Sequence, residues 1–204
     1  MSELPMTPAP PGPPPSPGIV VLGRFQPFHR GHESLLIAAE HWRSQNAENL
    51  SLIIAIGSSN REESLQNPWS ADERSAMVEA WLSESGIQDV RIVSIPDIED
   101  PPNWVSHAEQ YHGMSGILFT SDSPSAELYE AAGWKVLTAP LENRDSFEGW
   151  RVRETARMLS TIADEEAVRA VLSQTIPYVV VEYLVSNDAL RRLAFLGEGG
   201  EPVG

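Results

Sequence analysis

The chain of 204 residues contains no cysteine, which excludes a disulfide framework, cysteine-ligated zinc and a thiol nucleophile. It has no apolar run near the roughly 20 residues that a membrane-spanning helix needs, and no signal-peptide pattern at its N-terminus. Positive charge is scarce, because 14 Lys and Arg stand against 29 Asp and Glu, a net charge of −15. Proteins that bind a nucleic-acid backbone normally carry a basic face. We therefore expect a cytoplasmic protein with no membrane partner and no nucleic-acid partner.

The two ends of the chain differ in composition from its middle. Residues 1–17 hold eight of the 17 prolines and show no apolar periodicity, which predicts a disordered or polyproline-type Pro-rich leader. Residues 197–204, GEGGEPVG, predict a flexible tail. With 41% hydrophobic residues overall, the remaining residues 18–196 can bury the core of one domain.

Within that domain, short apolar runs alternate with helical patterns. Leu35, Leu36, Ala39 and Trp42 share one face of a predicted helix, and Ser70-Ala-Asp-Glu73 forms a capping box that opens another. Strands are predicted at residues 19–22, 50–56, 90–95, 117–119 and 136–137, and further helices at 70–81, 104–111 and 127–132. This alternation predicts an α/β fold, with an open parallel sheet and helices on both of its faces.

The C-terminal region has a different pattern, which predicts helices with no strands between them. After about residue 149 the chain is expected to be helical over 153–162, 165–172 and 177–195. Residues 178–184 are rich in valine, so a strand remains an alternative there.

The loop after the first predicted strand reverses the charge of the chain. Residues 23–32, GRFQPFHRGH, contain two arginines, two histidines and no acid. Ligands of open parallel sheets lie at the carboxyl ends of the strands, so this loop suits an anion. His29 and His32 can face one point beside the N-terminus of a helix that begins near Arg30, and Gly31 leaves space for a phosphate. A capping histidine and a surface histidine are the alternative reading.

These residues carry a family resemblance. His29-Arg-Gly-His32 resembles the H-x-G-H signature of the nucleotidyltransferase superfamily, and the string from Gly23 is especially similar to archaeal-type nicotinamide-nucleotide adenylyltransferases. The resemblance implies a Rossmann-like fold and transfer of the adenylyl group of ATP to nicotinamide mononucleotide, giving NAD and pyrophosphate in NAD biosynthesis. It also implies a homo-oligomer, with a hexamer as one form, and Mg²⁺ held mainly by the ATP phosphates, without a protein metal ligand. The loop residues implied to bind ATP are Gly23, Arg24, Phe25, His29, Gly31 and His32.

Two further segments extend the resemblance. Residues 63–74, ESLQNPWSADER, end in the family's Glu-Arg pair, and Arg74 shares the inward stripe of its helix with Met77 and Trp81. The resemblance assigns Arg74 to phosphate binding. The nicotinamide pocket implied by the resemblance comprises Gly57, Ser58, Asp97, Asn103 and Trp104. Trp104 is expected to stack on the flat, electron-poor nicotinamide ring, although an ordinary core tryptophan is the alternative.

Two segments match the family poorly. Ser121 and Asp122 stand where the family usually has Ser-Gly-Asn-Pro near the adenosine, and a plain turn would explain them equally well. In the last motif, residues 147–153, Gly149 and Arg153 match and are expected to bind ATP. Glu148, Trp150 and Arg151 replace the expected Ser, Thr and Glu. Glu148 would repel a triphosphate if it faced the site, whereas Arg151 would compensate if it points inward.

The implied mechanism needs no general base, because the attacking phosphate oxygen is already an anion. Catalysis would come from holding two polyanions in line and from stabilising the charge on the reacting phosphorus, with His29, His32, Arg24 and Arg153 as the catalytic residues. With Arg74 they would form a cationic pocket in an acidic protein. The alternatives are adenylyl or cytidylyl transfer to phosphopantetheine or a flavin mononucleotide, and a regulatory module that binds nucleotide without turnover. The residues leave open whether the amide or the acid mononucleotide is preferred.

Overall fold

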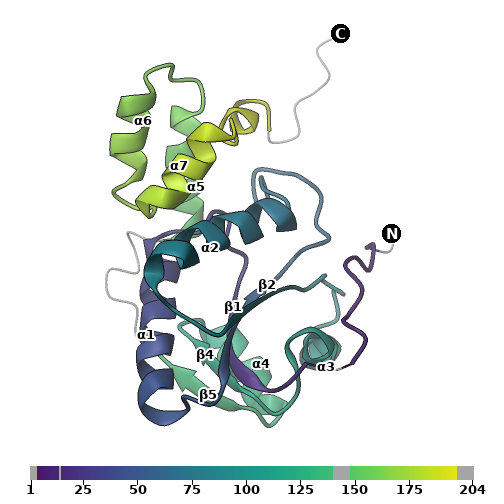
Figure 1. The fold of residues 1–204 in the computed structure, drawn as a ribbon. Coiled ribbons are helices and arrows are strands. Elements are labelled where there is room, and N and C mark those ends of the chain that lie inside the picture. Colours follow the sequence, from purple (N-terminus) through teal and green to yellow (C-terminus); the bar gives the residue numbers. More distant parts are fainter. Residues whose placement is uncertain (1–3, 14, 140–147, 197–204) are drawn as a thin grey trace. The chain divides into compact units, whose positions relative to one another are not determined.

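The computed structural model describes residues 4–13, 15–139 and 148–196, and these belong to two compact units (Figure 1). Unit 1 comprises Met1–Arg24, His32–Arg61 and Gly86–Glu142. Unit 2 comprises Phe25–Gly31, Glu62–Ser85 and Asn143–Gly204. Each unit is therefore assembled from three separate stretches of the chain. The predicted boundaries at residues 17 and 196 stay predictions.

Unit 1 is built on a five-stranded parallel sheet with the strand order β3-β2-β1-β4-β5. Its central strands β1 and β2 are apolar runs, as expected for strands covered on both faces, and they pair with Val20 opposite Ile53. All four strand pairings are parallel. The strands are β1 (Gly18–Gly23), β2 (Ser51–Ile56), β3 (Val90–Ser94), β4 (Ile117–Thr120) and β5 (Lys135–Thr138).

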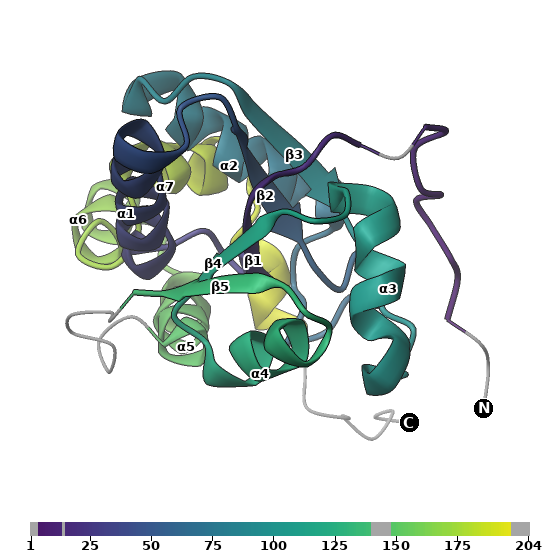
Figure 2. The same cartoon turned by 90° about the horizontal axis from the view of Figure 1, so that it is seen from below.

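Helices cover both faces of this sheet. Helix α1 (Arg30–Asn46) lies on one side, whereas α3 (Pro101–His112) and α4 (Ser123–Ala131) lie on the other (Figure 2). On the α3 and α4 side, Val20 belongs to one buried cluster with Ala108 and Tyr129. The predicted open parallel sheet with helices on both faces is therefore confirmed.

Unit 2 is helical, and its helices begin where local signals place them. Before α2, the Ser70 N–H donates to Glu73 Oε2 (2.8 Å) and the Glu73 N–H donates to Ser70 Oγ (3.2 Å), which confirms the predicted capping box. Helix α2 packs against α7. The helices of unit 2 are α2 (Ala71–Ser85), α5 (Gly149–Leu159), α6 (Glu165–Leu172), α7 (Tyr178–Ser186) and the short 3₁₀ helix η2 (Arg191–Ala194).

The C-terminal region agrees with the sequence expectation in one place and differs from it in another. The valine-rich residues 178–184 are helical, as predicted, and not the alternative strand, because Val180, Val181 and Leu184 bury one helical face in the core of unit 2. The helix predicted over residues 177–195 ends at Ser186 and does not continue to 195. Asp188 follows with a φ of 50°, a left-handed conformation that an α-helix cannot include.

The described part of the Pro-rich leader has no helix or strand, but unit 1 binds it by hydrogen bonds. The Tyr111 hydroxyl donates to the Pro8 carbonyl (3.0 Å), and Asn60 Nδ2 donates to the Pro5 carbonyl (3.0 Å). Arg91 donates to the Ser16 carbonyl (2.6 Å). Each bond uses a leader carbonyl as the acceptor, which suits a segment whose prolines lack an N–H. The composition of the leader indicates that it lacks apolar periodicity, but it does not identify the residues that bind its carbonyl groups. The predicted tail, residues 197–204, lies outside the described residues.

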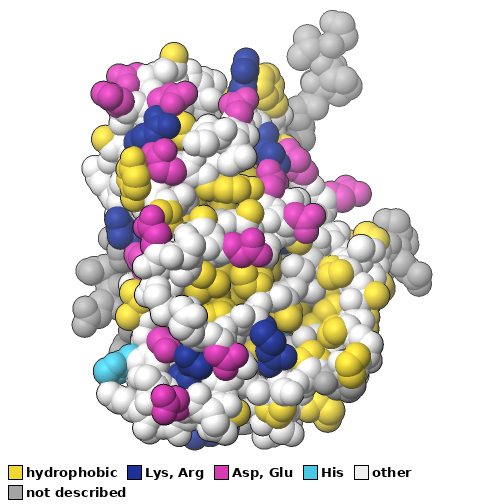
Figure 3. Space-filling view, in the orientation of Figure 1, with side chains coloured by type: hydrophobic (Ala, Val, Ile, Leu, Met, Phe, Trp, Pro, Cys, Tyr) yellow, Lys and Arg dark blue, Asp and Glu magenta, His cyan; other side chains and the backbone are white. Residues whose placement is uncertain are grey.

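The charges of the protein are mixed over the face drawn in Figure 3, where basic side chains lie close to acidic ones. Arg43 binds Glu40 (2.6 Å) in α1, and Arg192 binds Glu73 (2.6 Å) in unit 2. Several arginines are therefore held by carboxylates of their own unit. None of the helices in the described ranges is long and apolar enough to cross a membrane.

Candidate active site

The carboxyl ends of β1 and β2 are joined by a backbone hydrogen bond. The Gly57 N–H donates to the Gly23 carbonyl oxygen (2.9 Å). Ser58 follows with a φ of 53°, a left-handed conformation that is uncommon for a residue with a side chain and recurs at functional loops. The predicted site residues Gly23, Gly57 and Ser58 therefore lie together at the sheet edge where ligands of such folds bind. Arg24, the next residue after β1, is exposed.

His29 is a neutral, buried imidazole just before α1. The Gly31 N–H donates to His29 Nδ1 (3.1 Å), so Nδ1 carries a lone pair and the ring hydrogen is on Nε2. The ring is 6% exposed. This burial, followed by the positive charge of Arg153, lowers the pKa of His29 to about 4. At neutral pH His29 is therefore a hydrogen-bond donor through Nε2.

Arg153 and the start of α5 lie beside that donor. A Cβ atom at Gly149 would be 3.3 Å from Arg153 Nη1 and 3.7 Å from His29 Nε2. The N-cap residue of α5, Glu148, forms no side-chain hydrogen bond to the helix N-terminus. A helix N-terminus and an arginine both favour an anion. The structure thus brings the predicted residues His29, Gly149 and Arg153 together within unit 2.

A chain of hydrogen bonds fixes this loop in unit 2. Arg153 Nη1 donates to the Gln26 carbonyl (2.9 Å). The Gln26 side chain in turn donates to the Trp69 carbonyl (2.8 Å) and accepts from the Trp69 N–H (3.1 Å). The Trp69 indole N–H donates to the Ala189 carbonyl (2.9 Å). Gln26, Trp69 and Ala189 were not expected from the sequence, because they act by tying together segments that are remote along the chain.

Two charged residues of the altered last motif, Glu148 and Arg151, pair with each other. Arg151 Nε donates to Glu148 Oε2 (2.9 Å), and the Arg151 guanidinium lies over the Trp150 ring, 4.6 Å from its centroid. The Glu148 carboxylate is therefore paired with a cation. A cavity of about 400 Å³ adjoins this helix and is lined by Leu65, Trp150, Arg153, Glu154, Arg157 and Leu193. The part of the motif at Phe147 lies outside the described residues.

Arg74 is on the inward stripe of α2, as expected, and is only 1% exposed. Its Nε donates to the Ser70 carbonyl (3.2 Å). Phe25 is also buried in unit 2, where its ring stacks on Phe28 at 6.0 Å between centroids. His32, in the first turn of α1, is half-buried. The ATP contacts expected of Arg74, His32 and Phe25 stay predictions.

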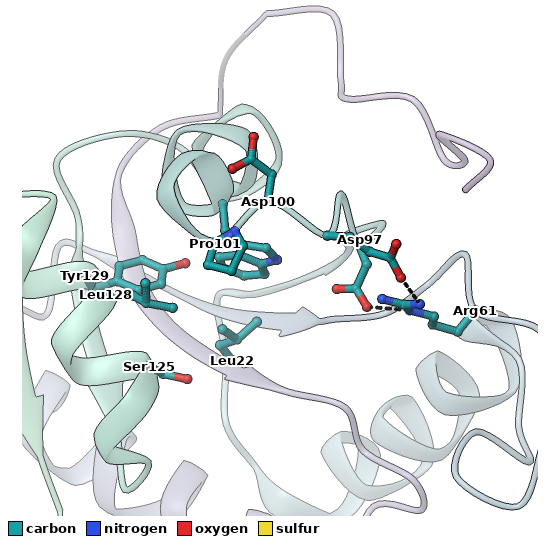
Figure 4. A pocket seen from close by; sticks show the side chains of 10 residues that line it. Leu22, Arg61, Asp97, Asp100, Pro101, Ser125, Leu128 and Tyr129 are labelled. Carbon is teal, nitrogen blue, oxygen red and sulfur yellow. Dashed lines mark hydrogen bonds and ion pairs between the residues drawn. The ribbon is translucent and has the colours of Figure 1, made fainter. Parts of the chain in front are cut away.

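Unit 1 contains a separate cavity of about 290 Å³ at the start of α3 (Figure 4). The predicted residues Asp97 and Trp104 both line it, together with Leu22 from the end of β1. The indole of Trp104 lies 6.2 Å from the Tyr129 ring, centroid to centroid. Asn103 is exposed instead, and its Nδ2 donates to Asp100 Oδ2 (2.7 Å). The full lining is Leu22, Arg61, Asp97, Glu99, Asp100, Pro101, Trp104, Ser125, Leu128 and Tyr129.

Arg61 pairs with two acidic residues of this cavity and was not predicted from the sequence. Its Nε donates to Asp97 Oδ2 (2.8 Å) and its Nη1 to Glu99 Oε1 (2.7 Å), as the dashed lines in Figure 4 mark. Both carboxylates raise the pKa of Arg61. A charged residue in the loop directly after Gly57-Ser58 is the signal that could have identified it.

The backbone around Asp97 is fixed by two buried side chains. Asn60 Oδ1 accepts from the Asp97 N–H (2.8 Å), and Asn60 Nδ2 donates to the Asp97 carbonyl (2.9 Å). His107 Nε2 is hydrogen-bonded to the Pro96 carbonyl (2.8 Å). His107 thus has a structural role, which is to position the loop between β3 and α3.

The residues after β4 form a turn. Asp122 is the N-cap of α4, and its Oδ2 accepts from the Ser125 N–H (2.9 Å) and from Ser125 Oγ (2.8 Å). The capping interpretation accounts for Asp122. The adenosine contacts expected of Ser121 and Asp122 stay predictions.

An open parallel sheet with loops at its carboxyl edge, and a histidine-arginine pair at a helix N-terminus, are typical of nucleotide-binding α/β proteins. Residues 20–154 match the family model described as Cytidylyltransferase-like. The nicotinamide-nucleotide adenylyltransferase of Picrophilus torridus is 36% identical over 181 residues, covering 89% of this chain and 98% of that relative. The enzyme of the same name from Thermoplasma acidophilum is 30% identical over 183 residues, covering 90% and 93%. The chain belongs to the cytidylyltransferase-like family and, within it, to the archaeal-type nicotinamide-nucleotide adenylyltransferases.

Solved structures show the same fold at low identity. A bifunctional NMN adenylyltransferase/ADP ribose pyrophosphatase from Francisella tularensis has a TM-score of 0.61 at 21% identity and covers 88% of this chain. This chain spans 52% of the length of that protein. The nicotinic acid mononucleotide adenylyltransferase of Plasmodium falciparum has a TM-score of 0.53 at 12% identity, covering 86% of this chain and 98% of that one. These likenesses confirm the Rossmann-like fold.

Proposed function

We propose that this protein transfers the adenylyl group of ATP to nicotinamide mononucleotide, giving NAD and pyrophosphate. The observation that carries the proposal is the neutral His29 beside Arg153 at the start of α5, in a chain whose relatives bear that enzyme's name. A donor, a cation and a helix N-terminus in one place suit a triphosphate.

In the proposed reaction, an oxygen of the mononucleotide phosphate attacks the α-phosphorus of ATP. A new oxygen–phosphorus bond forms, and the bond from the α-phosphorus to the bridging oxygen of the β-phosphate breaks, which releases pyrophosphate. His29 Nε2–H and the Arg153 guanidinium would donate to the phosphate oxygens and stabilise the charge that develops there. The nucleophile is already an anion, so no group of the protein has to remove a proton.

The remaining contacts of ATP are assigned on the family resemblance. Glu148 does not oppose them with an unpaired charge, because it is bound to Arg151. Mg²⁺ would arrive with ATP, held by phosphate oxygens and water, and would neutralise part of the triphosphate charge. The side chains of unit 2 fit a triphosphate that carries Mg²⁺, since His29 and Arg153 can donate hydrogen bonds to phosphate oxygens. The further ATP contacts proposed are Gly23, Arg24, Phe25, Gly31, His32, Arg74, Ser121, Asp122 and Gly149.

The nicotinamide ring is proposed to bind in the unit 1 cavity. Trp104 offers an indole face and Leu22 an apolar surface for a flat ring. Gly57 and Ser58, at the end of β2, would contact the same nucleotide, and Asn103 would act through Asp100.

We also propose that the protein is cytoplasmic and forms a homo-oligomer, with a hexamer as one form. Sedimentation analysis of the purified chain would measure the oligomeric state.

Product analysis tests the proposed reaction. The protein is incubated with ATP, Mg²⁺ and one acceptor, either nicotinamide mononucleotide, phosphopantetheine or flavin mononucleotide, and the products are separated by chromatography. We expect NAD and pyrophosphate in equal amounts from the first acceptor alone. Arg153→Ala should lower the rate at least about a hundredfold, as loss of a transition-state contact does, whereas Arg169→Ala in α6 should not. ATP binding without pyrophosphate from any acceptor would identify a regulatory module instead.

A further inference from the structure

The Pro-rich leader packs against unit 1 as well as forming hydrogen bonds with it. In Figures 1 and 2 the purple trace of the leader runs beside α3. Close to β1 it passes the C-cap of α3, where a Cβ atom at Gly113 would be only 2.6 Å from the Pro15 carbonyl oxygen. A side chain at Gly113 would therefore collide with the leader, so the end of α3 leaves room for it.

The loop after β2 connects the leader to the loop that contains Asp97. The side-chain amide of Asn60 has two hydrogens, and it donates one to the Pro5 carbonyl (3.0 Å) and one to the Asp97 carbonyl (2.9 Å). Asn60 Oδ1 accepts from the Asp97 N–H (2.8 Å). The adjacent Ser59 Oγ donates to the Thr7 carbonyl (3.3 Å). Release of the leader would thus take an acceptor away from the buried amide that holds Asp97.

A second connection runs through α3. The Tyr111 hydroxyl donates to the Pro8 carbonyl (3.0 Å), and burial raises the pKa of Tyr111, so the hydroxyl keeps its hydrogen at neutral pH. The Tyr111 ring meets the His107 ring edge-on, 5.2 Å between centroids. His107 Nε2 donates to the Pro96 carbonyl (2.8 Å), because a carbonyl can only accept. The leader therefore contacts the side chains that hold Pro96 and Asp97 from two different elements.

The composition of the leader suits a segment that binds through its backbone. Eight of its 17 residues are prolines. Proline restricts the backbone of the unbound segment, so less conformational entropy is lost when the segment is held in one conformation. A small number of hydrogen bonds to carbonyl oxygens can then keep such a segment in place.

We propose that the leader is a positioning segment for the mononucleotide, because Asn60, Ser59 and Tyr111 connect it to the loop of Pro96 and Asp97. The inference rests on the proposed function, since it takes the mononucleotide to be the ligand of the unit 1 cavity. The three side chains belong to unit 1, whereas the histidine–arginine pair proposed to bind ATP belongs to unit 2. The leader should therefore affect the binding of the mononucleotide and not that of ATP.

A double variant, Ser59→Ala/Tyr111→Phe, removes two donors to the leader from the full-length chain. It keeps the hydrogen bonds between Asn60 and Asp97, and it keeps an aromatic ring beside His107. We expect KM for nicotinamide mononucleotide to rise about threefold to tenfold, the size expected when one or two hydrogen bonds of ordinary strength are lost. The values of kcat and of KM for ATP should stay close to those of the wild-type protein.

Two further variants separate the leader from other effects of these substitutions. Ser83→Ala/Tyr183→Phe removes the same two hydroxyl groups from α2 and α7 of unit 2 and should keep the wild-type constants. Pro10→Gly/Pro11→Gly changes the leader alone, since it retains every carbonyl and loosens the backbone between the bound residues. It should also raise KM for the mononucleotide and leave KM for ATP unchanged.

Hydrogen exchange of the Asp97 amide measures the positioning without nucleotide or turnover. This N–H donates to Asn60 Oδ1, so it should exchange several-fold faster in Ser59→Ala/Tyr111→Phe than in the wild-type protein. Wild-type exchange, or a wild-type KM for the mononucleotide, in that variant overturns the inference. A rise in KM for ATP as large as that for the mononucleotide also overturns it. Faster exchange in the variant of a protein that forms no dinucleotide overturns the proposed reaction alone.

Discussion

Binding of a non-hydrolysable ATP analogue is expected to raise the pKa of His29 from about 4 toward neutrality. In the structure, burial and the Arg153 charge both oppose protonation of the ring. A phosphate oxygen near His29 Nε2 has the opposite sign and favours the imidazolium. A unit negative charge 4 Å away contributes about 4 kcal/mol at an effective dielectric constant of 20, which is about a thousandfold in the protonation equilibrium.

Proton uptake by calorimetry measures this change. The analogue is titrated into the protein at pH 7 in buffers of different ionisation enthalpy, and the slope gives the protons bound per nucleotide. We expect wild-type protein to take up about half a proton more than His29→Asn, since half-protonation at pH 7 follows from the thousandfold estimate. Asparagine retains an acceptor for the Gly31 N–H and removes the titrating ring.

The comparison between the two proteins isolates His29, because protonation of the nucleotide itself is common to both. His41→Asn on the exposed face of α1 is the matched control and should retain the wild-type uptake. Equal uptake in wild-type protein and His29→Asn, with both binding the analogue, would show that no phosphate charge lies within about 4 Å of the His29 ring. That result would refute the triphosphate site built on His29 and Arg153.

Two other substitutions test separate parts of the structure. Trp104→Ala should raise KM for nicotinamide mononucleotide about fivefold or more, because stacking contributes on the order of 1 kcal/mol. KM for ATP should stay nearly unchanged. Equal effects on the two KM values would contradict the assignment of Trp104 to the nicotinamide ring. Trp69→Phe leaves the buried Ala189 carbonyl without its indole donor and should lower the free energy of unfolding by about 1–3 kcal/mol in urea titrations. The comparison for Trp69→Phe is Trp42→Phe in α1, where the tryptophan is half-buried and the replacement keeps an aromatic ring beside Lys135.

Local signals predicted the parts of the fold that depend on a single stretch of sequence. The apolar runs of β1 and β2 and the Ser70–Glu73 capping box each define an element without help from the rest of the chain. The valine-rich α7 was predicted as a helix, but with a strand as the alternative. Its residues favour a strand by intrinsic preference, and packing against α2 and α6 stabilises the helix.

The site was predictable to a similar extent. His29, Gly149 and Arg153 were identified by motif, and the structure places them together. Arg61 was missed because its role comes from carboxylates 36 and 38 residues further along the chain. The orientation of the Tyr129 hydroxyl likewise depends on a histidine 17 residues away, and no spacing rule relates the two.

The hydrogen bonds around Gln26 also determine the order in which the molecule can be completed. Gln26 is bonded to Trp69, 43 residues later, and its carbonyl is bonded to Arg153, 127 residues later. Trp69 is bonded to Ala189, which is 120 residues beyond it. During synthesis the strands of unit 1 can pair while the C-terminal helices are still missing. The loop that holds His29 acquires its final partners only after almost the whole chain has been made. A chain truncated before α5 could therefore form the sheet yet lack the arrangement of His29 and Arg153 that is proposed to bind phosphate.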